Sequence, residues 1–376
     1  MARLLVTGGA GFIGSNFVRY WLREHSGDRV IVLDALTYAG NLASLQGLDP
    51  QRFSFVRGDI RDAALVEKLL RDERLDTVVH FAAESHVDRS ISSPDQFIQT
   101  NVLGTYTLLE AARKVWLTEK AAAPHRFHHV STDEVYGSLG PTDPAFVETT
   151  PYAPNSPYSA SKAASDHLVR AYHHTYGLAV TTSNCSNNYG PYHFPEKLLP
   201  LIIVNLLEGR PLPIYGDGRN IRDWLHVEDH CRAIDLIVHN GKVGEVYNVG
   251  GRSECENIEL VKLLCGAADR LMKASPPFAA RFPKCPATLG GACASLIQFV
   301  TDRPGHDRRY AIDATKIEKE LGFTPRVSLP DGLAGTLTWY LENEAWWRSV
   351  MDGSYRQWIA NQYGSVSRLS AVPTVP

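Results

Sequence analysis

The stretch Thr7-Gly8-Gly9-Ala10-Gly11-Phe12-Ile13-Gly14 follows a short apolar run, Arg3 to Thr7, and a helix is expected to follow it to about Arg23. Its glycines allow a tight turn and let the backbone approach a pyrophosphate at the N-terminus of that helix. The spacing is Gly-x-x-Gly-x-x-Gly, and a glycine-rich turn without a ligand is the alternative. The order strand, loop, helix favours dinucleotide binding, with contacts from Gly8, Gly11, Phe12, Ile13 and Gly14.

The second apolar run, Val30 to Leu33, ends in Asp34, which lies 20 residues after Gly14. A carboxylate at this place accepts hydrogen bonds from both hydroxyls of an adenosine ribose and repels a 2′-phosphate. The placement therefore favours NAD over NADP, and the alternative is that Asp34 caps the next turn. Further cofactor contacts are expected from residues after the strand ends and near the start of a later helix: Thr37, Asp59, Ile60, Ala82, Ala83 and Thr100.

Strand-like and helix-like segments alternate through the first half of the chain. Strands are predicted at 53–57, 77–82, 126–130 and 179–183, and helices at about 62–72, 94–116 and 157–176, the first of them capped by Asp62. Such alternation implies right-handed crossovers and a parallel sheet. The predicted fold class is α/β, with a Rossmann-like doubly wound parallel sheet.

The pattern changes after residue 184, where strands become short and Pro and Gly separators frequent. This change predicts a smaller C-terminal substrate-binding lobe over 185–346, after an NAD-binding domain over 1–184 to which 224–250 return. Residues 274–297 are expected to form an irregular surface excursion. Residues 347–376 are expected to be an extension whose tail is frayed.

The totals exclude several classes of protein. The 376 residues are 44% hydrophobic and 21% charged, with a formal net charge of −3, so there is no basic excess for nucleic acid. No apolar run is long enough for a membrane span, and no signal peptide is recognised. The six scattered cysteines fit reduced thiols in the cytoplasm better than disulfides, although Cys285 and Cys293 could pair. No metal site is predicted.

Two motifs carry the predicted chemistry. The first is His129-Val130-Ser131-Thr132-Asp133-Glu134-Val135-Tyr136-Gly137, in which a buried strand opens into polar residues at the edge where such sheets bind ligands. The second is Tyr158-Ser159-Ala160-Ser161-Lys162, which places Tyr158 and Lys162 on one helix face. An ammonium beside a phenol favours the phenolate, so Tyr158 is a candidate base. Tyr-x-x-x-Lys alone occurs in many helices by chance; its place downstream of Thr132 favours catalysis.

Together with Asn187-Asn188-Tyr189-Gly190-Pro191, Arg222-Asp223-Trp224 and Asp302-Arg303-Pro304-Gly305-His306-Asp307-Arg308-Arg309-Tyr310, these motifs closely resemble the extended short-chain dehydrogenase/reductases. Within them the pattern is most similar to the dTDP-glucose 4,6-dehydratases. The resemblance covers about residues 3–345, with the exception of residues 274–297.

The resemblance implies a redox-neutral reaction on bound NAD. Tyr158, its pKa lowered by Lys162, would take the proton of the sugar 4-hydroxyl, to which Thr132 hydrogen-bonds. Glu134 would remove the C5 proton and Asp133 would protonate the leaving 6-hydroxyl, giving a 4-keto-6-deoxy sugar. Adjacent carboxyls in a closed site can divide their pKa values in this way.

The resemblance also implies which residues bind the nucleotide sugar. By matching position these are Ser85, Thr132, Asn187, Lys197, Leu198, Pro213, Tyr215, Arg222, Asn257, Arg303 and His306, while Asn188 is expected to contact NAD. A homodimer through the helices at about 94–116 and 157–176 is expected, and supply of dTDP-rhamnose is a usual destination of the product.

Three other readings share most of these residues. A UDP- or CDP-glucose 4,6-dehydratase differs only in the base it accepts. A nucleotide-sugar 4-epimerase or a UDP-glucuronate decarboxylase needs no carboxyl pair after Thr132, so Asp133 and Glu134 argue against both. A non-catalytic NAD-binding protein would be expected to have lost Tyr158 or Lys162.

Overall fold

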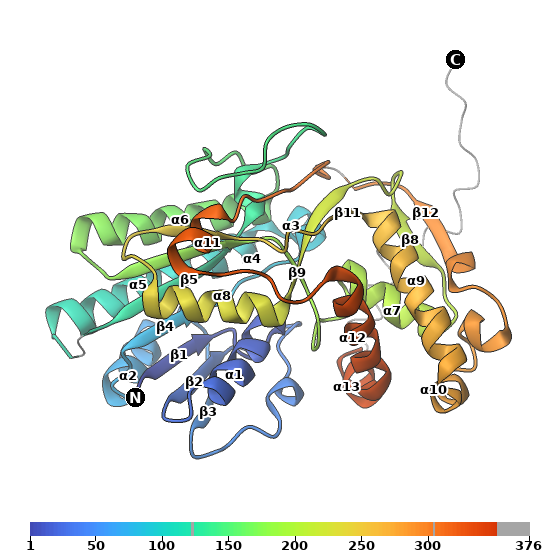
Figure 1. Ribbon diagram of the computed structural model, residues 1–376. Helices are drawn as coiled ribbons and strands as arrows, with labels where there is room; N and C mark the ends of the chain where they lie inside the picture. Colours follow the sequence, from blue (N-terminus) through green and yellow to red (C-terminus); the bar gives the residue numbers. More distant parts are fainter. Residues whose placement is uncertain (122–123, 304, 352–376) are drawn as a thin grey trace. The chain divides into compact units, whose positions relative to one another are not determined.

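The computed structural model describes residues 1–121, 124–303 and 305–351 and divides the chain into two compact units (Figure 1). The first unit comprises 1–192, 220–256 and the segment from 304 to 332; the second comprises 193–219, 257–303 and the segment from 333 onward. The segment after 304, predicted with the second lobe, is thus grouped with the first unit. The tail predicted to fray, after about Tyr363, lies outside the described residues.

A seven-stranded parallel sheet is the centre of the first unit. Its strand order is β10-β6-β5-β4-β1-β2-β3, so the order reverses between β1 and β4, where the glycine loop leaves the sheet. This arrangement confirms the predicted Rossmann-like fold. The strands are β1 (Arg3–Thr7), β2 (Arg29–Asp34), β3 (Phe53–Arg57), β4 (Thr77–His80), β5 (Arg126–Thr132), β6 (Val180–Cys185) and β10 (Val246–Val249).

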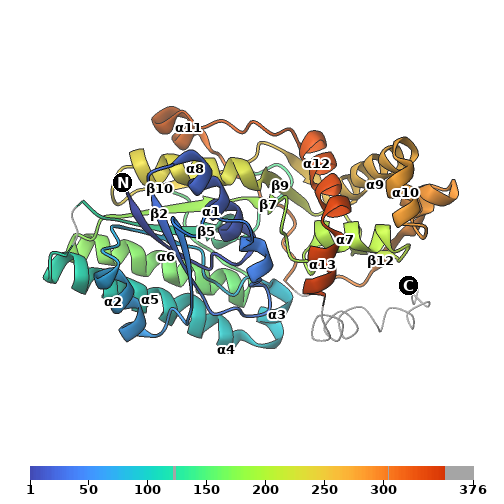
Figure 2. The same ribbon diagram turned by 90° about the horizontal axis from the view of Figure 1, so that it is seen from below.

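Helices cover both faces of this sheet (Figures 1 and 2). Alternate residues of a strand point to opposite faces, so Leu4 and Val6 pack against α1 (Phe12–Glu24) and α8 (Val227–Asn240). Leu5 faces the other way, into the cluster built on α2 (Ala63–Asp72), α5 (Thr105–Ala112) and α6 (Pro157–Tyr176). The Asp62 side chain caps α2 by accepting a 3.0 Å bond from the Leu65 N–H, as predicted.

The helix predicted at 94–116 contains two π-helical segments. It starts as α4 (Pro94–Phe97), widens in η2 (Ile98–Gly104), continues as α5 and widens again in η3 (Arg113–Thr118). Inside it the Thr105 hydroxyl donates a 2.6 Å bond to the Asn101 carbonyl. At Gly104 an added Cβ would lie 2.4 Å from Ile60, so a close contact with the segment after β3 accompanies the wider turns.

The remaining elements of the first unit are short. A three-stranded sheet in the order β11-β9-β7 contains Glu254–Glu256, Ile221–His226 and Asn187–Tyr189. The helical elements are η1 (Leu42–Leu45), α3 (Val87–Ser92), η4 (Asp133–Tyr136) and α11 (Thr315–Leu321).

The second unit is mainly helical. Its helices are α7 (Leu198–Leu207), α9 (Asn257–Ala274), α10 (Pro276–Arg281), η5 (Pro286–Leu289), η6 (Cys293–Leu296), most of α12 (Leu329–Glu342) and α13 (Glu344–Val350). Strand β8 (Leu212–Tyr215) pairs in parallel with β12 (Ile297–Val300). None of the helices in the described ranges combines the length and the apolar character that a membrane crossing requires.

Two expectations about the second unit are wrong. Residues 274–297 are not an irregular excursion, because α10, η5 and η6 order them and bury Phe282, Cys285 and Cys293. The two sulfur atoms lie 3.6 Å apart as thiols, and all six cysteines are free. The last helix, predicted from about Pro330 to Trp346, is interrupted at Asn343 between α12 and α13.

Candidate active site

The glycine loop lies against the end of β4. Gly8 has a φ of +70°, and a Cβ there would lie 2.6 Å from the Ala82 nitrogen. At Gly14 a Cβ would lie 2.3 Å from the Gly8 carbonyl oxygen, so the first turn of α1 approaches the loop more closely than any side chain allows. Gly11 is the N-cap of α1, and no side chain among the described residues caps it. Such a helix start suits a phosphate group.

Asp34 ends β2 beside this loop. It is 8% exposed and accepts bonds from the Ala10 N–H at 2.9 Å and the Leu36 N–H at 2.8 Å. Burial raises the pKa of its carboxyl, and the two N–H donors act in the opposite direction. The carboxylate is thus held beside the glycine cradle at a strand end. A glycine cradle and an oriented acid together fit the dinucleotide that the sequence predicts.

The other predicted cofactor residues lie mostly in the same region of the fold. Phe12 and Ile13 begin α1, Asp59 and Ile60 follow β3, and Ala82 and Ala83 follow β4. Thr37 is exposed in the loop after β2, and Thr100 is half-buried in η2. Asp59 is paired with Arg61 at 2.6 Å.

Strand β5 runs to Thr132, two residues further than predicted, and turns directly into η4. The Thr132 hydroxyl accepts a 3.3 Å bond from the Glu134 N–H. Asp133 is 2% exposed, and among the described residues its Oδ2 has no hydrogen-bond partner. Burial, followed by the nearby Glu134 and Asp223, raises the pKa of Asp133 well above its usual range. Burial and the neighbouring carboxyls therefore favour the protonated form of Asp133.

Helix α6 presents Tyr158 and Lys162 to this strand end. The helix begins with a capping box between Ser156 and Ser159. The Tyr158 phenol is hydrogen-bonded to Thr132, and the Lys162 Nζ donates a 2.8 Å bond to the Val130 carbonyl. The predicted lowering of the Tyr158 pKa by Lys162 is not found. Burial and the nearby Glu134 instead raise the pKa of Tyr158 well above its usual value.

A polar layer lies behind Lys162. Burial lowers the pKa of the Lys162 ammonium, and Asp166, one turn further along α6, acts against that. Burial also raises the pKa of Asp166 to about 6. Asp166 accepts a 2.8 Å bond from the Ser131 hydroxyl, and its other oxygen lies 3.1 Å from His129 Nε2 in a geometry that forms no hydrogen bond.

Five more predicted substrate or cofactor residues belong to the first unit. Arg222, in β9, donates to the Ile221 carbonyl at 2.7 Å and the Asp307 carbonyl at 2.9 Å, and its guanidinium lies 4.3 Å from the Tyr310 ring centroid. The Oδ1 of Asn188, in β7, accepts a 2.9 Å hydrogen bond from His230 Nδ1. Asn187 begins β7, Ser85 follows β4, and His306 lies before β-bridge residue Arg309.

The remaining predicted substrate residues belong to the second unit. Lys197 and Leu198 begin α7, Pro213 and Tyr215 are in β8, Asn257 begins α9, and Arg303 follows β12. Two more residues hold the site, and no signal in the sequence marks His230. Asn101 bonds both backbone groups of Glu84 and the Ser161 hydroxyl, and His230 holds Asn188. Only strand pairing and helix packing bring these partners together, so no local motif could reveal them.

Comparison with known proteins places this site in a family. The sequence model of the GDP-mannose 4,6 dehydratase family matches residues 5–336. The chain belongs to this family. A dTDP-glucose 4,6-dehydratase of Xanthomonas campestris is 58% identical over 359 residues, which cover 95% of this chain and 98% of the relative. A protein of the same name from Neisseria meningitidis is 55% identical over 359 residues, again 95% of this chain and 98% of the relative.

A solved structure of the family has the same architecture. The dTDP-glucose 4,6-dehydratase DesIV of Streptomyces venezuelae, crystallised with NAD bound, superposes with a TM-score of 0.81 at 50% identity. The match covers 93% of this chain and 99% of that one.

Proposed function

We propose that the chain is an NAD-dependent dTDP-glucose 4,6-dehydratase, a hydro-lyase that converts dTDP-glucose to dTDP-4-keto-6-deoxyglucose and water. The observation that carries this assignment is the state of Asp133. It is a buried acid whose pKa burial raises, beside Glu134 and directly after the threonine that hydrogen-bonds Tyr158. Elimination of water needs an acid and a base side by side, and this strand end provides both.

Each residue of the site has its own step in the proposed reaction. Tyr158 receives the proton of the sugar 4-hydroxyl, and Thr132, hydrogen-bonded to it, orients that hydroxyl. Bound NAD supplies the hydride acceptor for oxidation at C4 and returns the hydride to C6 within the same turnover. The ketone at C4 acidifies the proton at C5, which Glu134 removes while Asp133 protonates the departing 6-hydroxyl.

Because burial raises the pKa of Tyr158, the bound cofactor and substrate must favour loss of the phenolic proton. In the chain alone, burial favours the neutral phenol. Lys162 is held 2.8 Å from the Val130 carbonyl, on the same face of α6 as Tyr158. We infer that Lys162 orients the cofactor and that the positive charge of the oxidised cofactor assists loss of the phenolic proton.

The carboxyl pair also argues against other reactions on this fold. A 4-epimerase or a decarboxylase requires oxidation at C4 but no acid for a 6-hydroxyl, so a buried Asp133 with a raised pKa would have no role in either reaction. A dehydratase for UDP- or CDP-glucose would keep the pair, and the relatives named for dTDP-glucose favour the thymidine nucleotide. The binding roles of Lys197, Tyr215, Arg303 and the other substrate residues remain predictions.

We also propose a homodimer that uses the helices on one face of the first unit. Ile98 and Leu103 in η2, Tyr106 in α5 and Tyr176 at the end of α6 are exposed. Exposed apolar side chains on neighbouring helices suit a helix–helix interface between two copies. The cytoplasmic location expected from the sequence remains a prediction.

Mass spectrometry tests the assignment. The purified protein is incubated separately with dTDP-glucose, UDP-glucose and CDP-glucose. Loss of one water from the dTDP sugar alone, without net formation of NADH, supports the proposal. An unchanged mass with galactose after hydrolysis would indicate an epimerase, and no change in any sugar would indicate a binding protein.

A further inference from the structure

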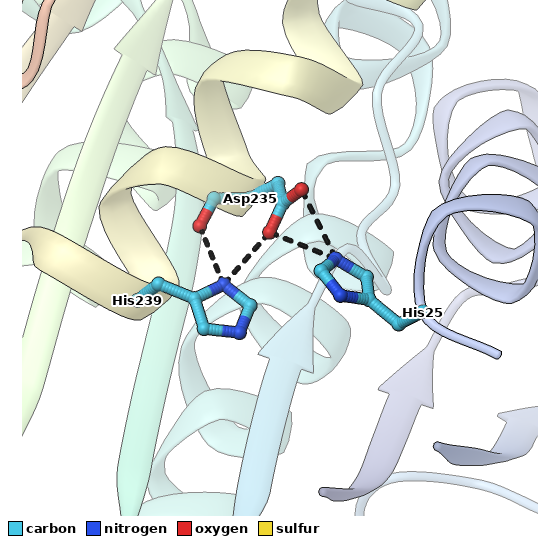
Figure 3. Close-up of side chains that lie close together, drawn as sticks. All are labelled: His25, Asp235 and His239. Carbon is cyan, nitrogen blue, oxygen red and sulfur yellow. Dashed lines mark hydrogen bonds and ion pairs between the residues drawn. The ribbon is translucent and has the colours of Figure 1, made fainter. Parts of the chain in front are cut away.

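Three potential metal ligands converge on the outer side of the first unit, at the ends of two helices. His25 is the C-cap of α1, while Asp235 and His239 lie one turn apart in the last part of α8. Figure 3 shows the two imidazole rings directed at the Asp235 carboxylate from opposite sides. We propose that this cluster binds one divalent transition-metal ion, with Zn²⁺ as the best-suited ion.

The distances suit a shared ion. His25 Nε2 lies 3.1 Å from each Asp235 oxygen, His239 Nδ1 lies 2.7 Å from Oδ1, and one ligand atom from each residue lies within 4.8 Å of the others. Two ligand atoms bound at about 2.0–2.1 Å to one tetrahedral zinc ion are separated by about 3.3 Å. Small side-chain rotations therefore convert the present contacts into a coordination shell.

The donor set selects the class of ion. Two imidazole nitrogens and one carboxylate suit zinc and its first-row neighbours, whereas Mg²⁺ and Ca²⁺ prefer oxygen ligands alone. The side chains of His25, Asp235 and His239 are 26%, 15% and 45% exposed, so an ion can enter and water can complete its shell. No local pattern in the sequence predicts the cluster, because His25 lies 210 residues before Asp235.

Neighbouring groups hold the ligands in place. The Tyr20 hydroxyl donates a 2.9 Å bond to Asp235 Oδ2. The Trp21 ring lies against both imidazoles, with ring centroids 4.3 Å from His25 and 5.2 Å from His239. Trp21 is itself fixed by a 3.1 Å bond from its Nε1 to Asp28. Outer partners of this kind orient metal ligands.

A bound ion would stabilise the packing of two helices and would take no part in the dehydration. Helix α1 starts at the glycine loop and ends before His25, and its 13 residues span about 20 Å. An ion here would join the ends of α1 and α8, which pack together through Phe17, Trp21, Cys231 and Ile234. The alternative is that the carboxylate only accepts hydrogen bonds from two imidazoles and holds the same helices without metal.

The test is calorimetric titration of the untagged full-length protein with Zn²⁺ in chelator-free buffer. We expect one ion per chain. Asp235→Asn and His239→Ala should each weaken binding by more than about 100-fold, and Tyr20→Phe by about 10- to 100-fold, as for loss of an outer partner. His174→Ala removes an exposed histidine from α6 and should leave the affinity unchanged. Dehydratase activity should persist in all four variants and so report that each is folded.

Titration with Co²⁺ distinguishes this site from the Cys285–Cys293 thiols, which lie 3.6 Å apart. Binding at the histidines should give visible d–d bands without a thiolate charge-transfer band. The proposal is overturned if the wild-type chain binds no Zn²⁺ saturably. It is overturned equally if the Asp235 and His239 variants bind as the wild type does, or if cobalt shows thiolate ligation that these variants leave intact.

Discussion

The Lys162 ammonium donates a 2.8 Å hydrogen bond to the Val130 carbonyl, which ties helix α6 to strand β5 two residues before Thr132. On the same helix Tyr158 is hydrogen-bonded to Thr132, so the two motifs, with 20 residues between them in the sequence, lie together in the fold. The acid and base carboxyls follow at once in η4. The order of chemical steps can therefore be tested residue by residue.

Glu134→Gln should separate oxidation from elimination. The amide cannot remove the C5 proton, so water loss should slow by about 10²–10⁴-fold, the usual contribution of a general base. Oxidation at C4 precedes that step, so substrate should still reduce the bound cofactor. Stopped-flow absorbance of the reduced nicotinamide, followed by mass spectrometry of the sugar, measures both events. Full turnover by this variant would remove Glu134 from its role as base.

Tyr158→Phe is the matched contrast, because it acts one step earlier. Without the phenol the 4-hydroxyl has no proton acceptor, and reduction of the bound cofactor should itself slow by about 10²–10⁴-fold. If reduced nicotinamide accumulates at the wild-type rate, Tyr158 is not the base for the first step.

Asp166→Asn should change stability in a manner that depends on pH. The folded-state pKa of Asp166 is raised from 3.8 to about 6, mainly by burial, so ionising this carboxyl costs more in the folded than in the unfolded chain. Below about pH 4 the Asp166 side chain is neutral in both the folded and the unfolded chain. As the pH rises from about 4 to about 6, the carboxyl ionises more readily in the unfolded chain, so the free energy of unfolding of the wild type falls. About two pKa units correspond to about 3 kcal/mol.

Denaturant unfolding of both proteins at pH 4 and pH 8 measures this effect. At each pH the free energy of unfolding of the variant is compared with that of the wild type. Between pH 4 and pH 8 this difference should shift by up to about 3 kcal/mol in favour of the variant. A difference that is the same at both values would show that Asp166 does not carry the raised pKa.

Gly14→Ala should weaken cofactor binding. The new Cβ would lie 2.3 Å from the Gly8 carbonyl oxygen, so the loop must move away from its present path. Overpacking of this kind costs about 1–3 kcal/mol, which is about 5- to 150-fold in the affinity for NAD. The control is Gly27→Ala, where an added Cβ meets no atom of the described residues within 4 Å. Calorimetric titration of cofactor-free protein should separate the two, and equal affinities would contradict the account of the loop.

Leu103→Glu should dissociate the proposed dimer. Leu103 is 43% exposed in η2, and a buried carboxylate at an interface would be strongly unfavourable. Leu263→Glu on α9 is the matched control, because that leucine is 45% exposed outside the proposed interface. Light scattering should find a dimer for the wild type and the control and a monomer for Leu103→Glu. A monomeric wild type, or a dimeric Leu103→Glu, would contradict the interface.

The sequence predicted those features of the fold that depend on residues close to one another in the chain. The glycines at 8 and 14 require close backbone contact, and Asp62 caps its helix through its own side chain. Buried polar residues were harder to place. Strand β6 was predicted to end at Ser183 but continues to Cys185, because the Asn184 amide donates to the hydroxyls of Tyr136 and Tyr152.

Features that depend on distant partners could not be predicted. The short strands β7, β9 and β11 are ordered by one another, and the Asn188–His230 contact joins residues 42 positions apart. The pKa of Tyr158 was predicted from Lys162 alone, whereas burial by the whole fold determines its direction.

The most direct measurement of the central claim uses dTDP-glucose labelled with deuterium at C4. If the bound cofactor takes the hydride from C4 and returns it to C6, the product loses one water and keeps the deuterium, which NMR will find in the C6 methyl group. Loss of water with loss of the label would contradict the internal return of hydride. Retention of the label at C4 without water loss would contradict the dehydratase assignment itself.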